Sequence, residues 1–173
     1  LPFILLAAVP AFAETDALGT LNPEEMTMGR VLEGIAEGET SMTNCAAGYL
    51  FTKSGRHKDA RDIFGACAEA GYPGAMTWMG QLDDNGLGEA EDPEAAADWD
   101  RRAAETGDPV GMFNYGLDLM RGRGVRPDES LGRAYVDRAA NLGLGVARRL
   151  QAADYDLDEV TPDADNWKYA PVF

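Results

Sequence analysis

The feature of this 173-residue sequence that most constrains its fold is a repeat with a period of 36 residues. The stretch "RRAAETGDPVGMFNYG", which begins at Arg101, is matched in part by "DRAANLGLGVARRL", which begins at Asp137. At this offset, residues 76–110 and residues 112–146 share ten identities: Met76/Met112, Gly80/Gly116, Gly86/Gly122, Gly88/Gly124, Asp92/Asp128, Arg102/Arg138, Ala103/Ala139, Ala104/Ala140, Gly107/Gly143 and Val110/Val146. A fixed period of this length is typical of stacked repeats, in which one unit cannot bury its apolar face alone. The repeat therefore predicts a solenoid.

Each unit contains the signals of two helices. Asp108 followed by Pro109 is typical of a helix start, and "VGMFNYGLDLM" continues that helix up to the glycines that begin at Gly122. Asp128 then starts a second helix, "ESLGRAYVDRAANLG", which ends at Gly143. The preceding unit follows the same plan, so the sequence predicts an all-α fold.

A shorter unit precedes these two and starts near Met42. Gly48 and Phe51 lie on its first helix, Ala60 and Phe64 lie on its second, and the turn between the helices is shorter than in the later units. The three units together cover residues 42–153, which also include the start of a closing helix.

The longer units, "MGQLDDNGLG…D…WDRRAAETG" and "YGLDLMRGRGV…D…YVDRAANLG", resemble Sel-one-like repeats. The first unit is similar to the related tetratricopeptide repeat. The resemblance implies a right-handed α-solenoid of stacked antiparallel helix pairs, whose first helices line a concave face. Asp83 stands where these families have an aromatic or apolar residue, which predicts loose packing or a slightly shifted helix in that unit.

The sequence begins with the apolar, uncharged stretch "LPFILLAAVPAFA". Its uninterrupted run of residues 1–9 is far shorter than the roughly 20 residues that cross a bilayer. Ala11 and Ala13 form the small-x-small pattern of a signal-peptidase site. We therefore expect residues 1–13 to be a signal peptide that lacks its first residues, with an uncleaved anchor as the alternative, and the protein to be exported, in bacteria to the periplasm.

The segments that flank the repeats have compositions of their own. We expect residues 14–41 to hold a capping helix that starts at Asn22 and Pro23, and residues 154–173 to form an acidic tail. Within that tail, Asp154, Asp156 and Asp158 have the spacing of the first ligands of a calcium loop. The glycine and glutamate that such loops require later are missing, so we predict no metal site there.

Two cysteines, Cys45 and Cys67, are the only ones in the chain. In an antiparallel helix pair, a step back along one helix is matched by an equal step forward along the other. If Gly48 faces Phe64, then Cys45 and Cys67 lie at one level of the first unit. The resemblance places Cys45 somewhat toward the concave side, but secreted relatives hold their repeats together with such bonds. We predict a structural disulfide, which forms in an oxidising compartment.

The formal net charge of −15 limits the possible partners. A chain this acidic repels nucleic-acid backbones and anionic lipid head groups. We therefore predict no nucleic-acid partner and no membrane span in the mature form. A basic peptide or another protein fits the charge better, although the acidic residues would also serve solubility alone. We expect a monomer.

Few residues in the sequence suit catalysis. The only histidine, His57, lies in a basic turn, and a second histidine for a zinc site is missing. The paired glycines lie in repeat turns and not between a strand and a helix, so they do not form a phosphate loop. We predict no catalytic residues, no metal and no cofactor.

Partner binding is predicted on the concave face. Phe113, Leu117 and Met120 recur at helical spacing and are offset from the neighbours that should pack inward. Apolar anchors beside acidic residues suit a bound peptide or helix. The alternative is that Phe113 and Leu117 pack against neighbouring helices, including the closing one. The predicted groove residues, chosen partly by the family resemblance, are Thr77, Gln81, Asp84, Phe113, Leu117, Met120 and Arg121.

The sequence thus indicates an exported interaction module that binds a partner protein or peptide, one form of which is a periplasmic regulator. The alternative is a hydrolase acting on peptidoglycan or β-lactams, an activity that the resemblance associates with secreted relatives. A hydrolase requires a nucleophile and a base that converge in a pocket, and no such pair is visible in the sequence.

Overall fold

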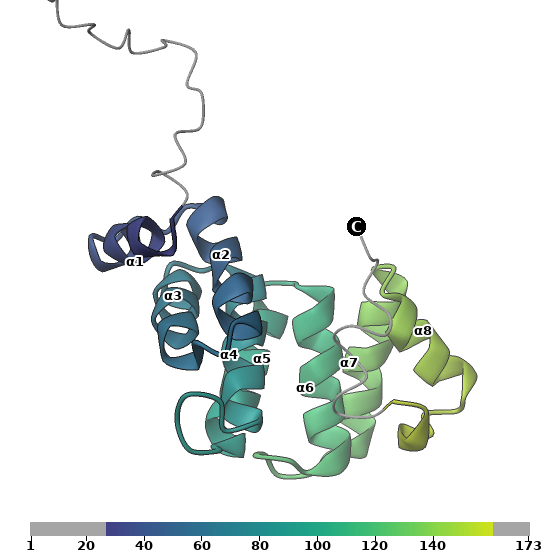
Figure 1. Ribbon diagram of the computed structural model, residues 1–173. Helices are drawn as coiled ribbons and strands as arrows, with labels where there is room; N and C mark the ends of the chain where they lie inside the picture. Colours follow the sequence, from purple (N-terminus) through teal and green to yellow (C-terminus); the bar gives the residue numbers. More distant parts are fainter. Residues whose placement is uncertain (1–26, 161–173) are drawn as a thin grey trace, which may run out of the picture.

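The computed structural model describes residues 27–160 and contains no strand in that range. In this described part of the chain, eight α-helices and one 3-10 helix follow one another (Figure 1). They are α1 (Met28–Ala36), α2 (Met42–Lys53), α3 (His57–Glu69), α4 (Pro73–Asp84), α5 (Pro93–Glu105), α6 (Pro109–Arg121), α7 (Glu129–Asn141), α8 (Gly145–Ala152) and η1 (Leu157–Glu159). The predicted all-α solenoid is confirmed.

The period of the sequence is also the period of the fold. Helices α3, α5 and α7 begin at His57, Pro93 and Glu129, each 36 residues after the last. Helices α4, α6 and α8 begin at the same interval. Residues 36 apart therefore occupy equivalent places in successive repeats, which lets one repeat be compared with the next.

Each helix from α2 to α8 packs against the helix before it and the helix after it. The helix pairs are α2–α3, α4–α5 and α6–α7, and α8 closes the stack (Figure 1). We call the contact between one pair and the next a joint: the first joint is α3–α4, the middle joint α5–α6 and the last joint α7–α8. The first helices α4 and α6 also touch each other, as expected for the inner side of a curved stack.

The predicted helix starts follow from side-chain capping. The carboxylates of Asp92, Asp108 and Asp128 accept hydrogen bonds from backbone N–H groups three residues later, at 3.0, 2.8 and 2.9 Å. These bonds satisfy N–H groups that have no partner inside the helix. At the other end of α6, Gly122 adopts a φ of 67°, a left-handed conformation that glycine enters without strain.

The core consists of two apolar clusters, one built mainly on α2 to α4 and one on α6 to α8. Small residues let the helices approach closely. A Cβ atom at Gly48 would lie 2.7 Å from the Phe64 ring, and one at Gly116 would lie 2.9 Å from the carbonyl oxygen of Gly132. The repeated glycines on the first helices are thus packing residues.

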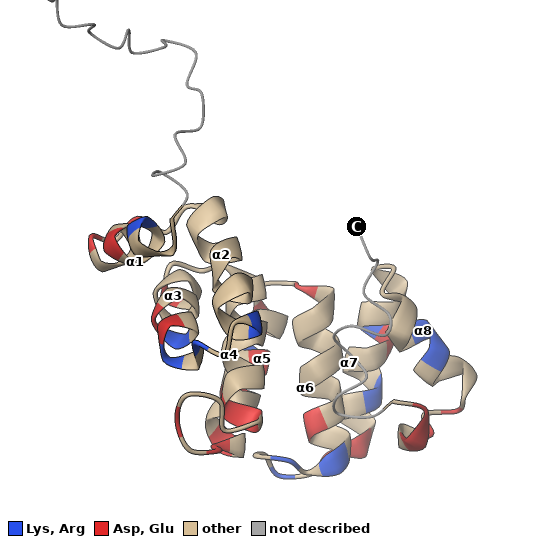
Figure 2. Ribbon diagram, viewed as in Figure 1, with Lys and Arg blue, Asp and Glu red and all other residues tan. Residues whose placement is uncertain are grey.

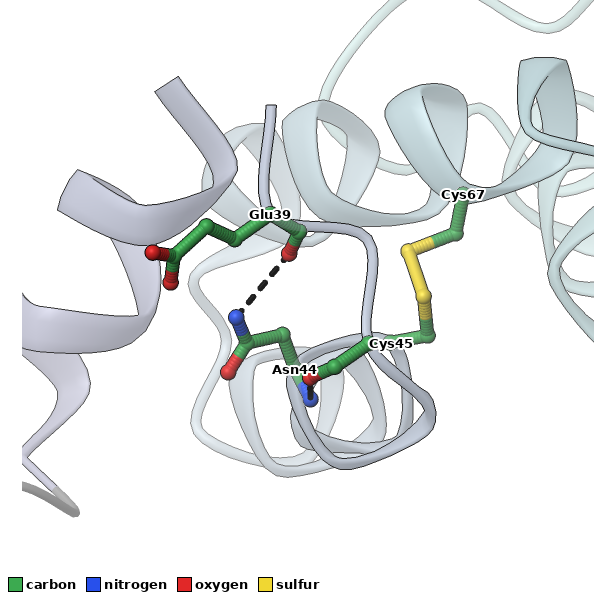
Figure 3. The surroundings of a disulfide bond; sticks show 5 residues. Glu39, Asn44, Cys45 and Cys67 are labelled. Carbon is green, nitrogen blue, oxygen red and sulfur yellow. Dashed lines mark hydrogen bonds between the residues drawn. A yellow bond between two sulfur atoms is a disulfide. The ribbon is translucent and has the colours of Figure 1, made fainter. Parts of the chain in front are cut away.

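The Cys45–Cys67 disulfide is present and joins α2 to α3 (Figure 3). The two Cα atoms are 5.9 Å apart. Next to it, the side-chain amide of Asn44 donates to the carbonyl oxygen of Glu39 at 2.9 Å, which ties the start of α2 to the preceding turn (Figure 3). The predicted pairing is confirmed.

Asp83 is buried in an ion pair, and this corrects the expectation of loose packing. Its carboxylate lies 2.6 Å from Nη2 of Arg61, and both side chains are 9% exposed. Arg61 also donates from Nε to the carbonyl oxygen of Leu87 at 2.8 Å. A charged pair from two successive repeats thus replaces an apolar contact at the first joint.

The two ends of the described chain differ from the sequence expectation. Helix α1 begins at Met28 with Thr27 as its cap, and the proposed cap Asn22 and the signal segment 1–13 lie outside the described residues. At the other end, Val160 is 1% exposed and belongs to the second cluster. The boundary at residue 154 is therefore wrong, because the chain stays packed on α8 through Val160.

Within residues 27–160, no helix combines the length and the apolar character needed to cross a membrane.

Charged residues are unevenly distributed over the helices. Helix α2 carries Lys53 as its only charged residue, and most of its ribbon is uncharged, whereas the second helices carry both signs (Figure 2).

Candidate functional site: a polar pocket at the middle joint

A pocket of about 50 Å³ opens between α4, α5 and α6. Because α4 and α6 are first helices, the pocket lies on the inner side of the solenoid, with α5 behind it. Its lining is mostly polar: Gly80, Gln81, Asp84, Ala96, Asp100, Asn114, Leu117, Asp118, Arg121 and Arg123. Sites for drug-sized ligands are typically about 300–1,000 Å³, so this pocket admits only a small group.

Four of the seven predicted groove residues lie together at this pocket. Gln81 and Asp84 reach it from α4, and Leu117 and Arg121 reach it from α6. Leu117 is only 3% exposed and contributes to the wall rather than to an open anchor. The pocket thus lies between the two helices from which the groove residues were predicted.

Phe113 is not a groove residue. It is 1% exposed and packs in the second core cluster with Val136, Ala139 and Leu150. Phe113 packs with Ala139, which is the equivalent of Cys67 two repeats later. Phe113 therefore has the place in the α6–α7 pair that Cys45 has in the α2–α3 pair. The prediction of Phe113 as an exposed anchor is wrong, and the alternative of packing against the closing helix describes it.

Thr77 and Met120 also lie away from the pocket lining. The Thr77 hydroxyl donates to the carbonyl oxygen of Gly74 at 3.0 Å, within its own helix. Met120 is partly buried against the second cluster, where its Cγ lies close to Gly132. Both have structural roles here.

Asp100 is the most deeply buried acid at the pocket. It is 8% exposed, and its Oδ1 accepts a hydrogen bond from the side-chain amide of Asn114 at 3.1 Å. Burial raises the pKa of Asp100 well above the usual range, and repulsion from Asp118 raises it further, while the Asn114 hydrogen bond acts in the opposite direction. No arginine or lysine forms a recorded ion pair with this carboxyl among the described residues.

Asp118 is the second acid whose charge is not neutralised. Its Oδ2 atom is shielded from solvent and has no hydrogen-bond partner among the described residues. Burial raises the pKa of Asp118 to about 7, with repulsion from Asp84 adding to the shift and Arg121 and Arg123 opposing it. Near neutral pH this carboxyl is therefore divided between its two protonation states.

The two arginines at the rim are already engaged. Arg123 pairs with Asp84 and also contacts Glu91 at 3.0 Å. Nη2 of Arg121 donates to the carbonyl oxygen of Val160 at 2.8 Å. Neither arginine forms an ion pair with Asp100 or Asp118 in residues 27–160, although both act on Asp118 at longer range.

Sequence reasoning missed Asp100, Asn114, Asp118 and Arg123. The resemblance directs attention to first helices, whereas Asp100 projects from the second helix α5. A signal was available in the repeat itself, because Asp118 stands 36 residues after Leu82, and Asp100 stands 36 residues after Phe64. Both acids thus replace residues that the preceding repeat buries.

The described residues offer little for metal or nucleophilic chemistry. In residues 27–160, no group of three or more His, Cys, Asp or Glu side chains is placed to hold a metal ion. This range includes Asp154, Asp156 and Asp158, and Asp156 accepts a hydrogen bond from the N–H of Asp158 at 3.0 Å. His57 is partly buried at the start of α3, with a shielded Nδ1 atom, and does not line the pocket.

Solved structures with this arrangement are Sel1-like repeat proteins. The Sel1 repeat protein of Oxalobacter formigenes is 25% identical, with a TM-score of 0.60 over 70% of this chain and 95% of that one. Cysteine rich protein B of Helicobacter pylori is 18% identical, with a TM-score of 0.58 over 73% and 98% of the two chains. A protective antigen of uropathogenic Escherichia coli with an SLR fold is 21% identical, with a TM-score of 0.52 over 70% of this chain and 31% of that one. No family model matches the sequence.

The stacked helix pairs define an α-solenoid, and its period of 36 residues is shared by sequence and fold. Within that class, the fold is similar to that of the Sel1-like repeat proteins, in agreement with the repeat motifs of the sequence.

Proposed function

We propose that this chain is an exported interaction module that binds a segment of a partner protein along the inner face of α2, α4 and α6. The observation that carries the proposal is the pocket between α4 and α6, which opens on that face and is too small for a complete small-molecule ligand. A pocket of this size suits one side chain of a larger partner that lies along the groove.

The same face offers an aromatic contact at its other end. Tyr49 of α2 is 39% exposed, and its ring centre lies 5.6 Å from that of Trp78 on α4. Aromatic side chains are enriched in protein interfaces because they supply a large contact area. Tyr49 and Trp78 therefore offer a partner an aromatic contact on the first helices α2 and α4.

Export to an oxidising compartment, in bacteria the periplasm, is part of the proposal. The buried Cys45–Cys67 disulfide supports it, because such bonds persist mainly in oxidising compartments. The apolar first residues support it as well.

A hydrolase is the alternative function. Asp100 and Asp118 have raised pKa values, as catalytic carboxyls often do. The small volume of the pocket disfavours this reading, since a sugar or lactam ring has to enter beside both carboxyls.

Site-specific photo-crosslinking in the native compartment tests the proposal. A photo-reactive amino acid in place of Gln81, on the inner face, is expected to capture a discrete partner. The matched control is the same amino acid in place of Asp62, which is exposed on α3. Equal capture from both positions, or turnover of a cell-wall or lactam substrate that one pocket substitution abolishes, would refute it.

A further inference from the structure

The middle joint is polar at the places where the other two joints are apolar. Phe64 stacks on Trp78 at the first joint, with ring centres 5.4 Å apart and planes within 4°. The equivalent residues 36 positions later are Asp100 and Asn114. A further 36 positions on, they are Val136 and Leu150, both fully buried.

A third position differs between the first two repeats but not between the last two, because the residue 36 positions after Asp118 is Asp154. Leu82 of α4 is fully buried, and its equivalent on α6 is Asp118. Asp118, Asp100 and Asn114 all line the one pocket. Two polar residues at otherwise apolar positions therefore meet a third, which replaces the buried leucine of the preceding repeat. Departures from a locally consistent pattern tend to mark functional sites, because they lower stability without a structural gain.

The charge at this place is not balanced from within the protein. Asp83, the buried acid of the first joint, has Arg61 within 2.6 Å. Asp100 has only the neutral amide of Asn114, and Oδ2 of Asp118 has no partner among the described residues. Buried carboxylates are normally paired, since burial of an isolated charge costs several kcal/mol. What these two acids lack, within residues 27–160, is an ion-pair partner.

We propose that the pocket at the middle joint binds the cationic end of one partner side chain, the ammonium of a lysine or the guanidinium of an arginine, between Asp100 and Asp118. This inference rests on the proposed function, because it names the residue type that the inner face selects. The available volume of about 50 Å³ fits the end of such a side chain. The surplus of acidic residues in the chain, 30 against 15 basic ones, also attracts a basic partner.

Other occupants fit the pocket less well. An anion would meet two carboxyls, and of the two rim arginines Arg123 is already ion-paired, while Arg121 donates to the carbonyl oxygen of Val160. The described residues hold no group of three or more ligands placed for a metal. A neutral apolar side chain would leave the buried oxygen of Asp118 without a partner, which is the unfavourable state that the protein has without a ligand.

Binding of the cation requires the loss of a proton. A protonated Asp118 carries no charge, so the cation binds best to the ionised form, and its affinity rises with pH through the pKa of about 7. The charged or titratable groups that act electrostatically on Asp118 or Asp100 from the surrounding elements are Asp84, Asp108, Tyr115, Arg121 and Arg123.

A titration of the full chain with n-butylammonium, a lysine side-chain analogue, tests the inference. The carboxyl carbon of Asp118 is followed by NMR as a function of pH. Saturating n-butylammonium is expected to lower the pKa of Asp118 from about 7 toward the ordinary range. The dissociation constant should be about tenfold higher at pH 6 than at pH 8, as expected for a single linked proton. Equal concentrations of n-butanol and of sodium chloride are the controls. A pKa that falls no further with n-butylammonium than with sodium chloride would overturn the inference.

Two substitutions at the pocket extend the test. Asp118→Leu restores the residue type of the preceding repeat, and Asp118→Asn keeps the shape of the side chain. Both are expected to abolish the n-butylammonium shift of the Asn114 side-chain amide signals. Asp62→Asn, which removes an exposed charge on α3, should leave it unchanged. An unchanged shift in either Asp118 variant would contradict the assignment.

The outcomes separate this inference from the proposed function. If n-butylammonium fails to bind while the Gln81 crosslink to a partner persists in Asp118→Leu, the cation site is wrong and the inner-face interaction stands. If n-butylammonium binds but Gln81 captures no partner, the cation site stands and the proposed function fails.

Discussion

The first and middle joints of the solenoid bury acidic residues in opposite ways. At the first joint, Asp83 is neutralised by Arg61, and the neighbouring Phe64–Trp78 stack is apolar. At the middle joint, the positions of Asp83 and Arg61 are taken by Leu119 and Ala97, and the position of the stack is taken by Asp100 and Asn114. Positions that are charged at the first joint are thus apolar at the middle joint, and positions that are apolar at the first joint are polar at the middle joint.

This difference gives the two joints different roles, one in stability and the other in binding. A buried acid with its own arginine is satisfied and offers nothing to a ligand. A buried acid without one has a raised pKa and remains able to accept a cation, at a cost in stability. The comparison predicts that the first joint holds the fold together and that the middle joint holds the partner.

Phe64→Ala is expected to have the largest effect. It removes the stack on Trp78 and leaves a cavity beside Gly48, so the free energy of unfolding should fall by about 3–5 kcal/mol. Denaturant unfolding measures it. The matched change at the middle joint is Asp100→Val, which introduces the residue of the last joint and should cost less than about 1 kcal/mol or stabilise. Equal losses in both variants would remove the distinction between the joints.

Arg61→Ala should cost nearly as much, about 3–5 kcal/mol, because it leaves the Asp83 carboxylate buried without its partner. The double variant Arg61→Ala/Asp83→Leu installs the residues of the middle joint at the first. It is expected to recover most of the loss, as measured in a double-mutant cycle. A double variant as unstable as Arg61→Ala would show that the pair is not replaceable by apolar contact.

Loss of the disulfide should have a somewhat smaller effect. Replacing both Cys45 and Cys67 by Ala removes a crosslink between residues that are 22 positions apart in the sequence. The free energy of unfolding should fall by roughly 3 kcal/mol, as loop-closure entropy predicts. Because the bond lies in the α2–α3 pair, n-butylammonium binding at the middle joint should be unchanged below the unfolding transition. Loss of binding in the folded double variant would show that the two regions are coupled.

The pH dependence of stability should also differ between the wild type and Asp118→Leu. A carboxyl whose pKa is raised in the folded state binds more protons there than in the unfolded chain. Its ionisation therefore destabilises the fold as the pH rises from about 4 to about 7. Asp118→Leu should remove this contribution, so its gain in stability over the wild type should grow to a few kcal/mol by pH 8. Thermal unfolding at pH 5 and pH 8 measures it, and a gain independent of pH would contradict the raised pKa.

Much of the fold could be predicted from the sequence because the period fixes it. The caps Asp92, Asp108 and Asp128 begin helices as expected, and the antiparallel register placed Cys45 opposite Cys67. The same register places Phe113 opposite Ala139, so the burial of Phe113 was also within reach. It was missed because a large apolar residue on a first helix resembles a groove anchor.

The site was only half predictable. Gln81, Asp84, Leu117 and Arg121 follow from the inner face of the first helices. Asp100 and Asp118 could have been noticed as acids at apolar repeat positions. Their lack of an ion-pair partner could not have been predicted. Asp83 is also an acid at an apolar repeat position, yet it is neutralised by Arg61 from another repeat. Whether a buried acid is paired depends on distances between repeats, which the sequence does not contain.

The most direct test of the account is the ionisation of Asp118 in the protein without any partner. An NMR titration midpoint near 7 is predicted for its carboxyl carbon. A midpoint near 4 for Asp118 would show that its charge is already neutralised, and would contradict the claim that the middle joint is built to receive a cation.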